Sequence, residues 1–189
     1  MKFKGVIFDL DGTLVDSLED LANSVNRMLS VKGFPEHDLK EYRYFVGDGI
    51  LMLIKRALPL EYAADEAFVK ECLKVVNEEY MNRWSDCTRP YDGVPKLLSK
   101  INEHEMKLAV LSNKPHEFTR LIVPHFFPEI SFDIVFGARE GVPRKPDTTA
   151  VYEILESLGI AAKECLYVGD SNIDMKTGRG AGMFTVGVS

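Results

Sequence analysis

The sequence predicts an α/β fold: a Rossmann-like parallel sheet with helices on both faces, and an α-helical bundle inserted near its beginning. Short apolar runs alternate with helix-like stretches along most of the chain, as they do in repeated βαβ units. Several of these runs are rich in Val and Ile, which is typical of strands buried on both faces. A βαβ unit takes about 30 residues, yet the second sheet strand is expected roughly a hundred positions after the first. That interval indicates the insertion.

The elements of the sheet domain follow from the apolar pattern. Helix-like spacing of apolar residues is found at 94–101, 118–122 and 150–158, and each stretch predicts a helix with one buried face. The expected strands are Gly5–Leu10, Lys107–Leu111, Phe132–Phe136, Cys165–Val168 and Phe184–Val188.

The insertion is expected to begin with a helix. Ser17 and Asp20 have the spacing of a capping box, apolar residues follow at helical spacing from Leu18 to Leu29, and Gly33 and Pro35 mark the end of that helix. Further helices are expected near Asp38–Phe45, Ile50–Leu58 and Ala64–Arg83. We therefore expect a core domain of residues 1–16 and 89–189, and a helical cap domain of residues 17–88.

Composition limits the possible partners. With 189 residues the chain can bury on the order of 70% of its unfolded surface and fold without staples. The net charge of −6 argues against nucleic acid as a partner, because such binding relies on a basic surface. No stretch is apolar and long enough to span a bilayer. Three scattered cysteines favour a reducing compartment. We expect a cytoplasmic protein.

Polar side chains gather at the expected strand ends. In an open parallel sheet, ligands bind outside the carboxyl ends of the strands, so these side chains should converge on one crevice. A cluster of carboxylates repels itself unless a cation offsets the charge, and hard oxygen ligands favour Mg²⁺. This combination suits phosphoryl transfer. The side chains are Asp9, Asp11, Thr13, Ser112, Asn113, Lys114, Lys145, Asp170 and Asp174.

Four short segments carry a resemblance to a known family. "DLDGTLVDS", "LSNK", "RKPD" and "GDSNID", in this order and spacing, resemble the four signature motifs of the haloacid dehalogenase superfamily, and the similarity spans essentially the whole chain. The helical insertion lies where that superfamily carries its C1 cap. A capped α/β hydrolase that uses Mg²⁺ is what the resemblance implies.

The resemblance also implies roles for individual residues. Asp9 would be the nucleophile that forms an aspartyl-phosphate, and Asp11 the acid and then the base, positioned by Thr13. Ser112 and Asn113 would hold phosphate oxygens, and Lys145 would neutralise the phosphate and the nucleophile. The metal ligands would be Asp9, the carbonyl of Asp11, Asp170 and Asp174.

Two branches of the superfamily fit these motifs. An aspartate at position 11 favours phosphatases and sugar phosphomutases over dehalogenase-like and phosphonate-cleaving members. "VGDGILMLIKRALP" resembles the cap loop and helix of the phosphoglycolate phosphatase group, so Gly47 and Gly49 are candidates for a substrate loop. On spacing alone, two such glycines are more often a flexible hinge before a helix than a substrate contact.

We therefore expect a Mg²⁺-dependent phosphatase of small phosphorylated metabolites. A β-phosphoglucomutase-like phosphomutase stays open as the alternative, and a catalytically idle binding module on the same fold is a third reading. Thr148 departs from that group, which usually has a second proline after "KPD". The sequence ends just after the last expected strand, where relatives continue, and it leaves monomer or dimer open.

Overall fold

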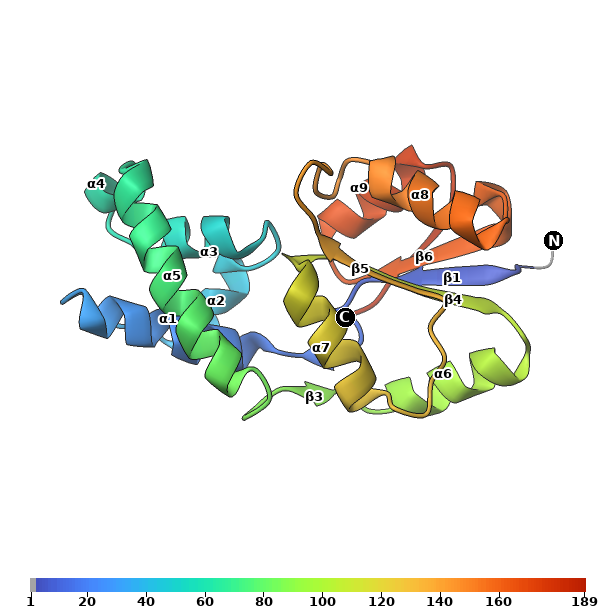
Figure 1. The fold of residues 1–189 in the computed structure, drawn as a ribbon, viewed down its shortest axis with the longest axis horizontal. Helices are drawn as coiled ribbons and strands as arrows, with labels where there is room; N and C mark the ends of the chain where they lie inside the picture. Colours follow the sequence, from blue (N-terminus) through green and yellow to red (C-terminus); the bar gives the residue numbers. More distant parts are fainter. Residues whose placement is uncertain (1–2) are drawn as a thin grey trace. The chain divides into compact units, whose positions relative to one another are not determined.

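The chain forms two compact units, which are described here from a computed structural model that covers residues 3–189 (Figure 1). The α/β unit consists of the residues up to Asp16 together with Pro90–Ser189, and the helical unit consists of Ser17–Arg89. The chain passes between the units through two short strands that pair with each other, β2 (Val15–Asp16) and β3 (Arg89–Pro90).

A parallel sheet forms the centre of the α/β unit, with the strand order β5-β4-β1-β6-β7. The strand β1 lies in the middle, and all four of its residues are buried. Phe8, its last residue, lies beside Val110 of β4 and Val168 of β6. The residues that follow these three positions therefore meet at one edge of the sheet. The strands are β1 (Gly5–Phe8), β4 (Lys107–Pro115), β5 (Ile134–Ala138), β6 (Cys165–Gly169) and β7 (Phe184–Gly187).

Helices cover both faces of this sheet. In Figure 1, α8 and α9 lie on one face and α6 and α7 on the other. Ile7, Ala109 and Leu111 pack with Val151 and Ile154 of α8 in one buried cluster, because alternate residues of a strand point to the same face. The expected α/β architecture is confirmed. The helices are α6 (Val94–Glu103), α7 (His116–Phe126), α8 (Thr149–Leu158) and α9 (Asn172–Gly180), with the 3₁₀ turn η1 (Ala162–Glu164) before β6.

The strand β4 is longer than the apolar pattern predicts. It continues from Leu111 to Pro115, and its pairing with β5 shifts register between these two residues. Every residue from Leu108 to Lys114 is buried, as in β1, because helices cover both faces of the sheet. Irregular strand pairing of this kind often re-aims side chains near a functional site.

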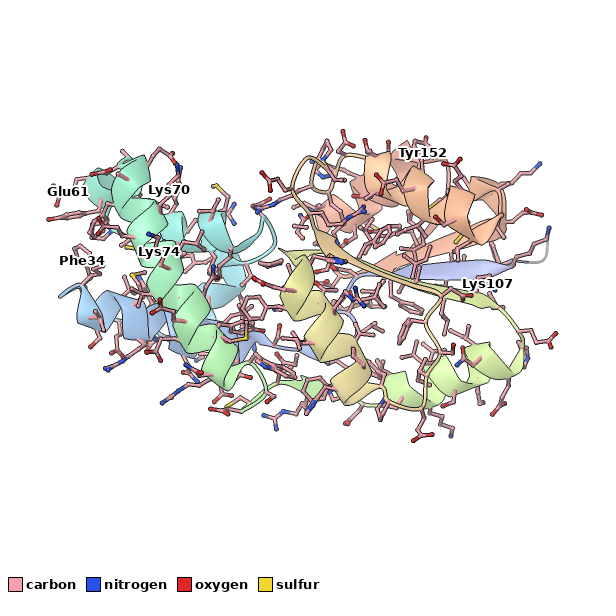
Figure 2. The ribbon with its side chains drawn as sticks, in the orientation of Figure 1. Phe34, Glu61, Lys70, Lys74, Lys107 and Tyr152 are labelled. Atoms are coloured by element: carbon pink, nitrogen blue, oxygen red, sulfur yellow. The ribbon has the colours of Figure 1, made fainter. Side chains whose placement is uncertain are left out.

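The helical unit has its own core. Val25, Met28 and Leu29 of the first helix are fully buried against Ile54 and Val76 of later helices. Phe34, labelled in Figure 2, lies edge-on to Tyr62 with ring centroids 4.7 Å apart. The helices are α1 (Leu18–Val31), α2 (Leu39–Phe45), α3 (Ile50–Ala57), α4 (Leu60–Ala63) and α5 (Glu66–Arg83). None of the helices among residues 3–189 combines the length and the apolar character needed to cross a membrane.

The expected capping box at the start of α1 is wrong. Ser17 makes no side-chain capping hydrogen bond, and the Asp20 carboxylate instead accepts from the amides of Cys87 and Thr88 and from the Thr88 hydroxyl. Asp20 is 1% exposed, and a buried carboxylate is stabilised best by several donors at once. The acid therefore ties the two ends of the helical unit together.

Candidate active site

Three carboxylates converge at the carboxyl edge of the sheet. Asp9 follows β1, Asp170 follows β6, and Asp174 lies in the first turn of α9. One oxygen of each lies within 4.8 Å of one oxygen of the others. Asp9 and Asp174 are buried, whereas Asp170 is exposed. Such a set of hard oxygen donors fits Mg²⁺, which binds through a few carboxylates and keeps an open side for water or phosphate.

A buried lysine joins two of these carboxylates. The Nζ atom of Lys145 lies 2.9 Å from Oδ1 of Asp9 and 2.7 Å from Oδ1 of Asp174. The lysine side chain is 3% exposed, so its charge depends on these partners rather than on water. Burial would lower the pKa of Lys145, but Asp9, Tyr167 and Asp174 together raise it above its usual range, so the lysine stays protonated.

Burial disfavours the ionised form of Asp9. Burial raises the pKa of the Asp9 carboxyl to about 7; Lys145 lowers it, and the Asp174 carboxylate raises it further. An adjacent divalent cation would favour the ionised form. The electrostatics of the residues present therefore fit a metal ion at this position.

A glycine lets the loop after β1 approach Asp170. Gly12 has φ of +84°, and a Cβ atom there would lie 2.4 Å from Oδ2 of Asp170. No other residue type combines this backbone conformation with so close an approach. Next to it, the hydroxyl of Thr13 donates to Oδ1 of Asp170 at 3.0 Å. The "DGT" segment thus holds Asp170, and the expected role of Thr13 in positioning Asp11 stays a prediction.

The start of α9 holds Asp174. Ser171 is the N-cap of this helix, and its hydroxyl accepts from the amide of Asp174 at 3.2 Å. In return, Oδ2 of Asp174 accepts from the amide of Ser171 at 3.1 Å. This reciprocal capping box leaves Oδ1 of Asp174 for Lys145.

Asn113, near the end of β4, holds the loop that carries Lys145. The side-chain amide of Asn113 donates to the Lys145 carbonyl at 3.2 Å, and its oxygen accepts from the Lys145 amide at 3.0 Å. Asn113 therefore fixes the main chain that carries Lys145, a role that the sequence did not indicate. Ser112 is buried, and its hydroxyl oxygen accepts from the amide of Lys114 at 3.2 Å.

Asp11 lies apart from the three clustered carboxylates and pairs with a second lysine. The Nζ atom of Lys114 lies 3.0 Å from Oδ1 and 3.3 Å from Oδ2 of Asp11. The sequence placed Lys114 at a strand end but assigned it no role. A signal was present, since a lysine directly after Ser112 and Asn113 is expected at the same sheet edge as Asp11.

The glycines of the expected substrate loop belong to the helical unit. Gly47 has φ of +112° and Gly49 has φ of +86°, and Gly49 is the N-cap of α3. Arg56 anchors this segment by donating to the Phe45 carbonyl at 2.9 Å and by pairing with Asp48. The loop is thus held within its own unit, and its contact with a substrate stays a prediction.

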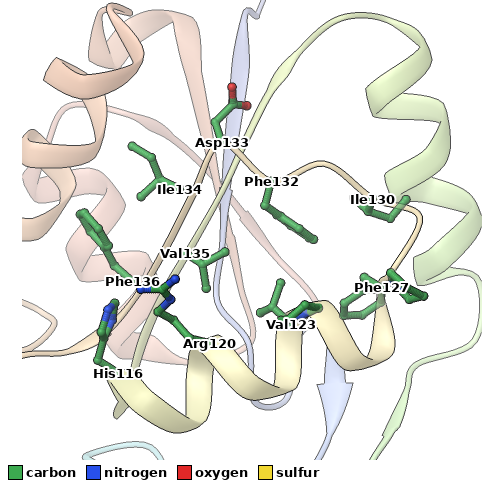
Figure 3. Close-up of a pocket in the computed structure, with 12 residues that line it drawn as sticks. His116, Arg120, Val123, Phe127, Ile130, Phe132, Asp133, Ile134, Val135 and Phe136 are labelled. Atoms are coloured by element: carbon green, nitrogen blue, oxygen red, sulfur yellow. The ribbon is translucent and has the colours of Figure 1, made fainter.

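A cavity of about 480 Å³ lies elsewhere in the α/β unit, between α7 and β5 (Figure 3). Most of the residues that line it are apolar, including Val123, Phe127 and Phe136. The one carboxylate among the lining residues, that of Asp133, accepts hydrogen bonds from the Lys107 ammonium group and from the amide of Leu108. This cavity lacks the paired acids of the sheet edge, so we place the chemistry at the carboxylate cluster.

Fold and site together define a class. An open parallel sheet that gathers acidic residues and a buried lysine at its carboxyl edge, with a helical unit inserted after the first strand, is typical of phosphoryl-transfer hydrolases. Residues 6–188 match the family model of haloacid dehalogenase-like hydrolases, and the chain belongs to this family.

Known proteins agree with this assignment. A phosphoglycolate phosphatase of Pseudomonas putida is 32% identical over 187 residues, which cover 97% of this chain and 68% of that protein. One of Xanthomonas campestris is 34% identical over 188 residues, covering 98% of this chain and 83% of that protein. A crystal structure described as a predicted phosphoglycolate phosphatase from Haemophilus somnus superposes with a TM-score of 0.91 at 29% identity, covering 99% of this chain and 85% of that one.

These comparisons confirm the expected family and a hydrolase of the phosphatase type.

Proposed function

We propose that the protein is a Mg²⁺-dependent phosphatase of small phosphomonoesters that works through a phosphorylated aspartate, with 2-phosphoglycolate as the first substrate to test. The observation that carries the proposal is the approach of Asp9, Asp170 and Asp174 to within 4.8 Å of one another, with Lys145 between two of them. The names of the phosphatases quoted above support the substrate class.

Asp9 is the proposed nucleophile. An oxygen of its carboxylate attacks phosphorus, and the bond from phosphorus to the ester oxygen breaks, which leaves a phosphoryl group on Asp9. Lys145 holds the charge of the nucleophile and of the incoming phosphate, because its Nζ atom already lies 2.9 Å from Asp9. Mg²⁺, held by Asp9, Asp170, Asp174 and the main-chain carbonyl of Asp11, would supply further positive charge for the phosphate oxygens.

Asp11 is the proposed acid and base. In the first step it gives a proton to the departing ester oxygen. In the second step it takes a proton from water, whose oxygen attacks phosphorus and releases inorganic phosphate and the Asp9 carboxylate. Asp11 suits this work because its side chain is 27% exposed, so it is open to substrate and to water. Ser112 and Asn113, buried at the end of β4, are proposed to hold phosphate oxygens through their hydroxyl and main-chain amide groups.

The helical unit is the proposed cap. Its loop with Gly47 and Gly49 would contact the substrate, and closure would exclude bulk water from the phosphoenzyme. We also propose a cytoplasmic location, which fits the three free cysteines, and a small phosphorylated metabolite as the only partner that the chemistry requires.

Phosphate release from a panel of phosphomonoesters tests the proposal. The panel contains 2-phosphoglycolate, sugar phosphates and 4-nitrophenyl phosphate, each assayed with Mg²⁺ and with excess chelator. We expect free phosphate from at least one ester with Mg²⁺ and none with chelator. An absence of turnover on every ester would overturn the proposal. Transfer of phosphate to another hydroxyl of a sugar, with no free phosphate, would indicate a phosphomutase instead.

A further inference from the structure

Each of the two aspartates after β1 has a buried lysine of its own. Lys145 reaches Asp9 at 2.9 Å, and Lys114 reaches Asp11 at 3.0 Å. Both lysine side chains are 3% exposed. The two lysines come from different parts of the fold, since Lys114 lies in β4 and Lys145 follows β5.

The position of Lys114 is set by the irregular end of β4. Its pairing with β5 shifts register between Leu111 and Pro115, and the amide of Lys114 donates to the hydroxyl oxygen of Ser112. Burying a lysine near the end of a strand is costly unless a counter-charge compensates it. Asp11 supplies that charge through both of its oxygens, at 3.0 and 3.3 Å.

The pair restricts Asp11 more than Lys114. Asp11 lies in the loop after β1, directly before Gly12. Its side chain is 27% exposed, so a carboxylate there would otherwise have several rotamers open to it. An ammonium group that contacts both oxygens, and is itself held by a rigid strand, fixes the direction in which the carboxyl group points. Directional control matters for a general acid, because proton transfer requires the correct approach to the leaving oxygen.

We propose that Lys114 is a positioning residue that orients Asp11 toward the leaving-group oxygen. The inference rests on the proposed phosphatase function, in which Asp11 is the acid. Lys145, by contrast, contacts the proposed nucleophile Asp9. The effect of removing each lysine on the rate should therefore depend differently on the leaving group. Loss of Lys145 slows phosphoenzyme formation from every ester, whereas loss of Lys114 slows it for those esters whose leaving group needs a proton.

The test compares esters with poor and good leaving groups in the full-length protein. We measure kcat/KM, which depends on the steps up to leaving-group departure and not on the later hydrolysis of the phosphoenzyme. We expect Lys114→Met to lower kcat/KM by about 10- to 100-fold for 2-phosphoglycolate or another alkyl phosphate that the wild type hydrolyses, and by less than about threefold for 4-nitrophenyl phosphate. Lys114→Arg should recover part of the loss on the alkyl ester. Equal losses of kcat/KM on both esters would overturn the proposal.

A matched control comes from the other end of the same strand. Lys107, labelled in Figure 2, begins β4 and pairs with Asp133 at 2.8 Å. Lys107→Met removes a lysine-aspartate pair from the same strand without touching the carboxylate cluster. It should leave kcat/KM unchanged for both esters. A leaving-group effect in this variant as large as that of Lys114→Met would contradict the specific role of Lys114.

A double-mutant cycle separates positioning from a direct effect. In an Asp11→Asn background, Lys114→Met should change kcat/KM for the alkyl ester by less than about twofold, because the carboxylate that Lys114 orients is already gone. A double variant whose loss equals the product of the two single losses would overturn the proposal.

If Lys114→Met does not fold, Lys114→Gln replaces it. Failure of both variants to fold would also overturn the proposal, since the lysine would then be required for the fold. An inactive wild type overturns the phosphatase proposal and this one together, whereas an active wild type without a leaving-group effect overturns this one alone.

Discussion

The side chain of Asn113 holds the main chain of Lys145 at both its carbonyl and its amide, at 3.2 and 3.0 Å. These two hydrogen bonds fix the main chain of Lys145 and therefore the position from which its side chain reaches Asp9. Asn113→Ala should therefore lower kcat by about 10- to 100-fold, because small misplacements of charged groups in an active site are costly. Steady-state phosphate release at saturating substrate measures the effect.

The helical unit contains a control for this substitution. Asn26 makes the same two hydrogen bonds to the main chain of His37, at 2.9 and 3.0 Å. Asn26→Ala should lower the free energy of unfolding by about 1–3 kcal/mol and leave kcat within about threefold of wild type. Equal losses of kcat in the two variants would show that Asn113 acts on stability alone.

Gly12 should be indispensable for a reason beyond its backbone conformation. Gly12→Ala places a methyl group against Asp170, since the Cβ position lies 2.4 Å from Oδ2. Gly141 has a similar φ of +75° but no atom within 4 Å of its Cβ position. Both alanine variants should lose about 1 kcal/mol of stability or more through the strained φ. Only Gly12→Ala should lose activity with Mg²⁺, and equal activities would remove Asp170 from the site.

Asp20 should contribute strongly to the stability of the helical unit. Its carboxylate is buried and accepts from the amides of Cys87 and Thr88. Asp20→Ala leaves these buried donors without their acceptor, so the free energy of unfolding in urea should fall by about 2–4 kcal/mol. Glu78→Ala, on an exposed position of α5, should change it by less than about 0.5 kcal/mol. A loss as small as that of Glu78→Ala would show that the hydrogen bonds of Asp20 do not stabilise the fold.

The raised pKa of Asp9 predicts a pH dependence in metal-free protein. The folded carboxyl keeps its proton up to about pH 7, whereas the unfolded one ionises near 3.8. Between these values the folded state binds more protons, so this group stabilises the fold at low pH and the benefit is lost as pH rises to about 7. Relative to Asp9→Asn, the wild type should lose about 1–3 kcal/mol between pH 4 and 7 in chelator.

Thermal or urea unfolding of both proteins across this pH range measures the difference. The comparison with Asp9→Asn cancels the titration of the other groups. Parallel stability curves for the two proteins would contradict a raised pKa at Asp9. Added Mg²⁺ should reduce the pH-dependent difference, because a cation bound to the ionised carboxylate favours the folded state.

The parts of the site that could be predicted from sequence are those that follow from strand ends. Asp9, Asp170 and Lys145 lie together because parallel strands end at one edge of the sheet, and an apolar run followed by a polar motif locates such an end. The expected strand borders were less accurate: β4 includes Ser112, Asn113 and Lys114, since buried polar residues with good partners do not end a strand.

Partners across loops could not be predicted in this way. The spacing of Ser17 and Asp20 matches a capping box, but Asp20 binds amides 67 and 68 positions further along the chain. Likewise, the hydrogen bonds between the Asn113 side chain and the Lys145 main chain depend on the path of the loop after β5. Local patterns give the residue types available, and the tertiary path decides which donor meets which acceptor.

Identification of the phosphorylated residue is the most direct test of the account. Asp11→Asn should still transfer phosphate from 4-nitrophenyl phosphate, whose leaving group needs no acid, but it should hydrolyse the phosphoenzyme slowly for lack of a base. Acid quenching followed by peptide mass spectrometry should then find phosphate on Asp9. Phosphate on another residue, or a rapid burst of 4-nitrophenol with no phosphorylated peptide, would contradict nucleophilic catalysis by Asp9.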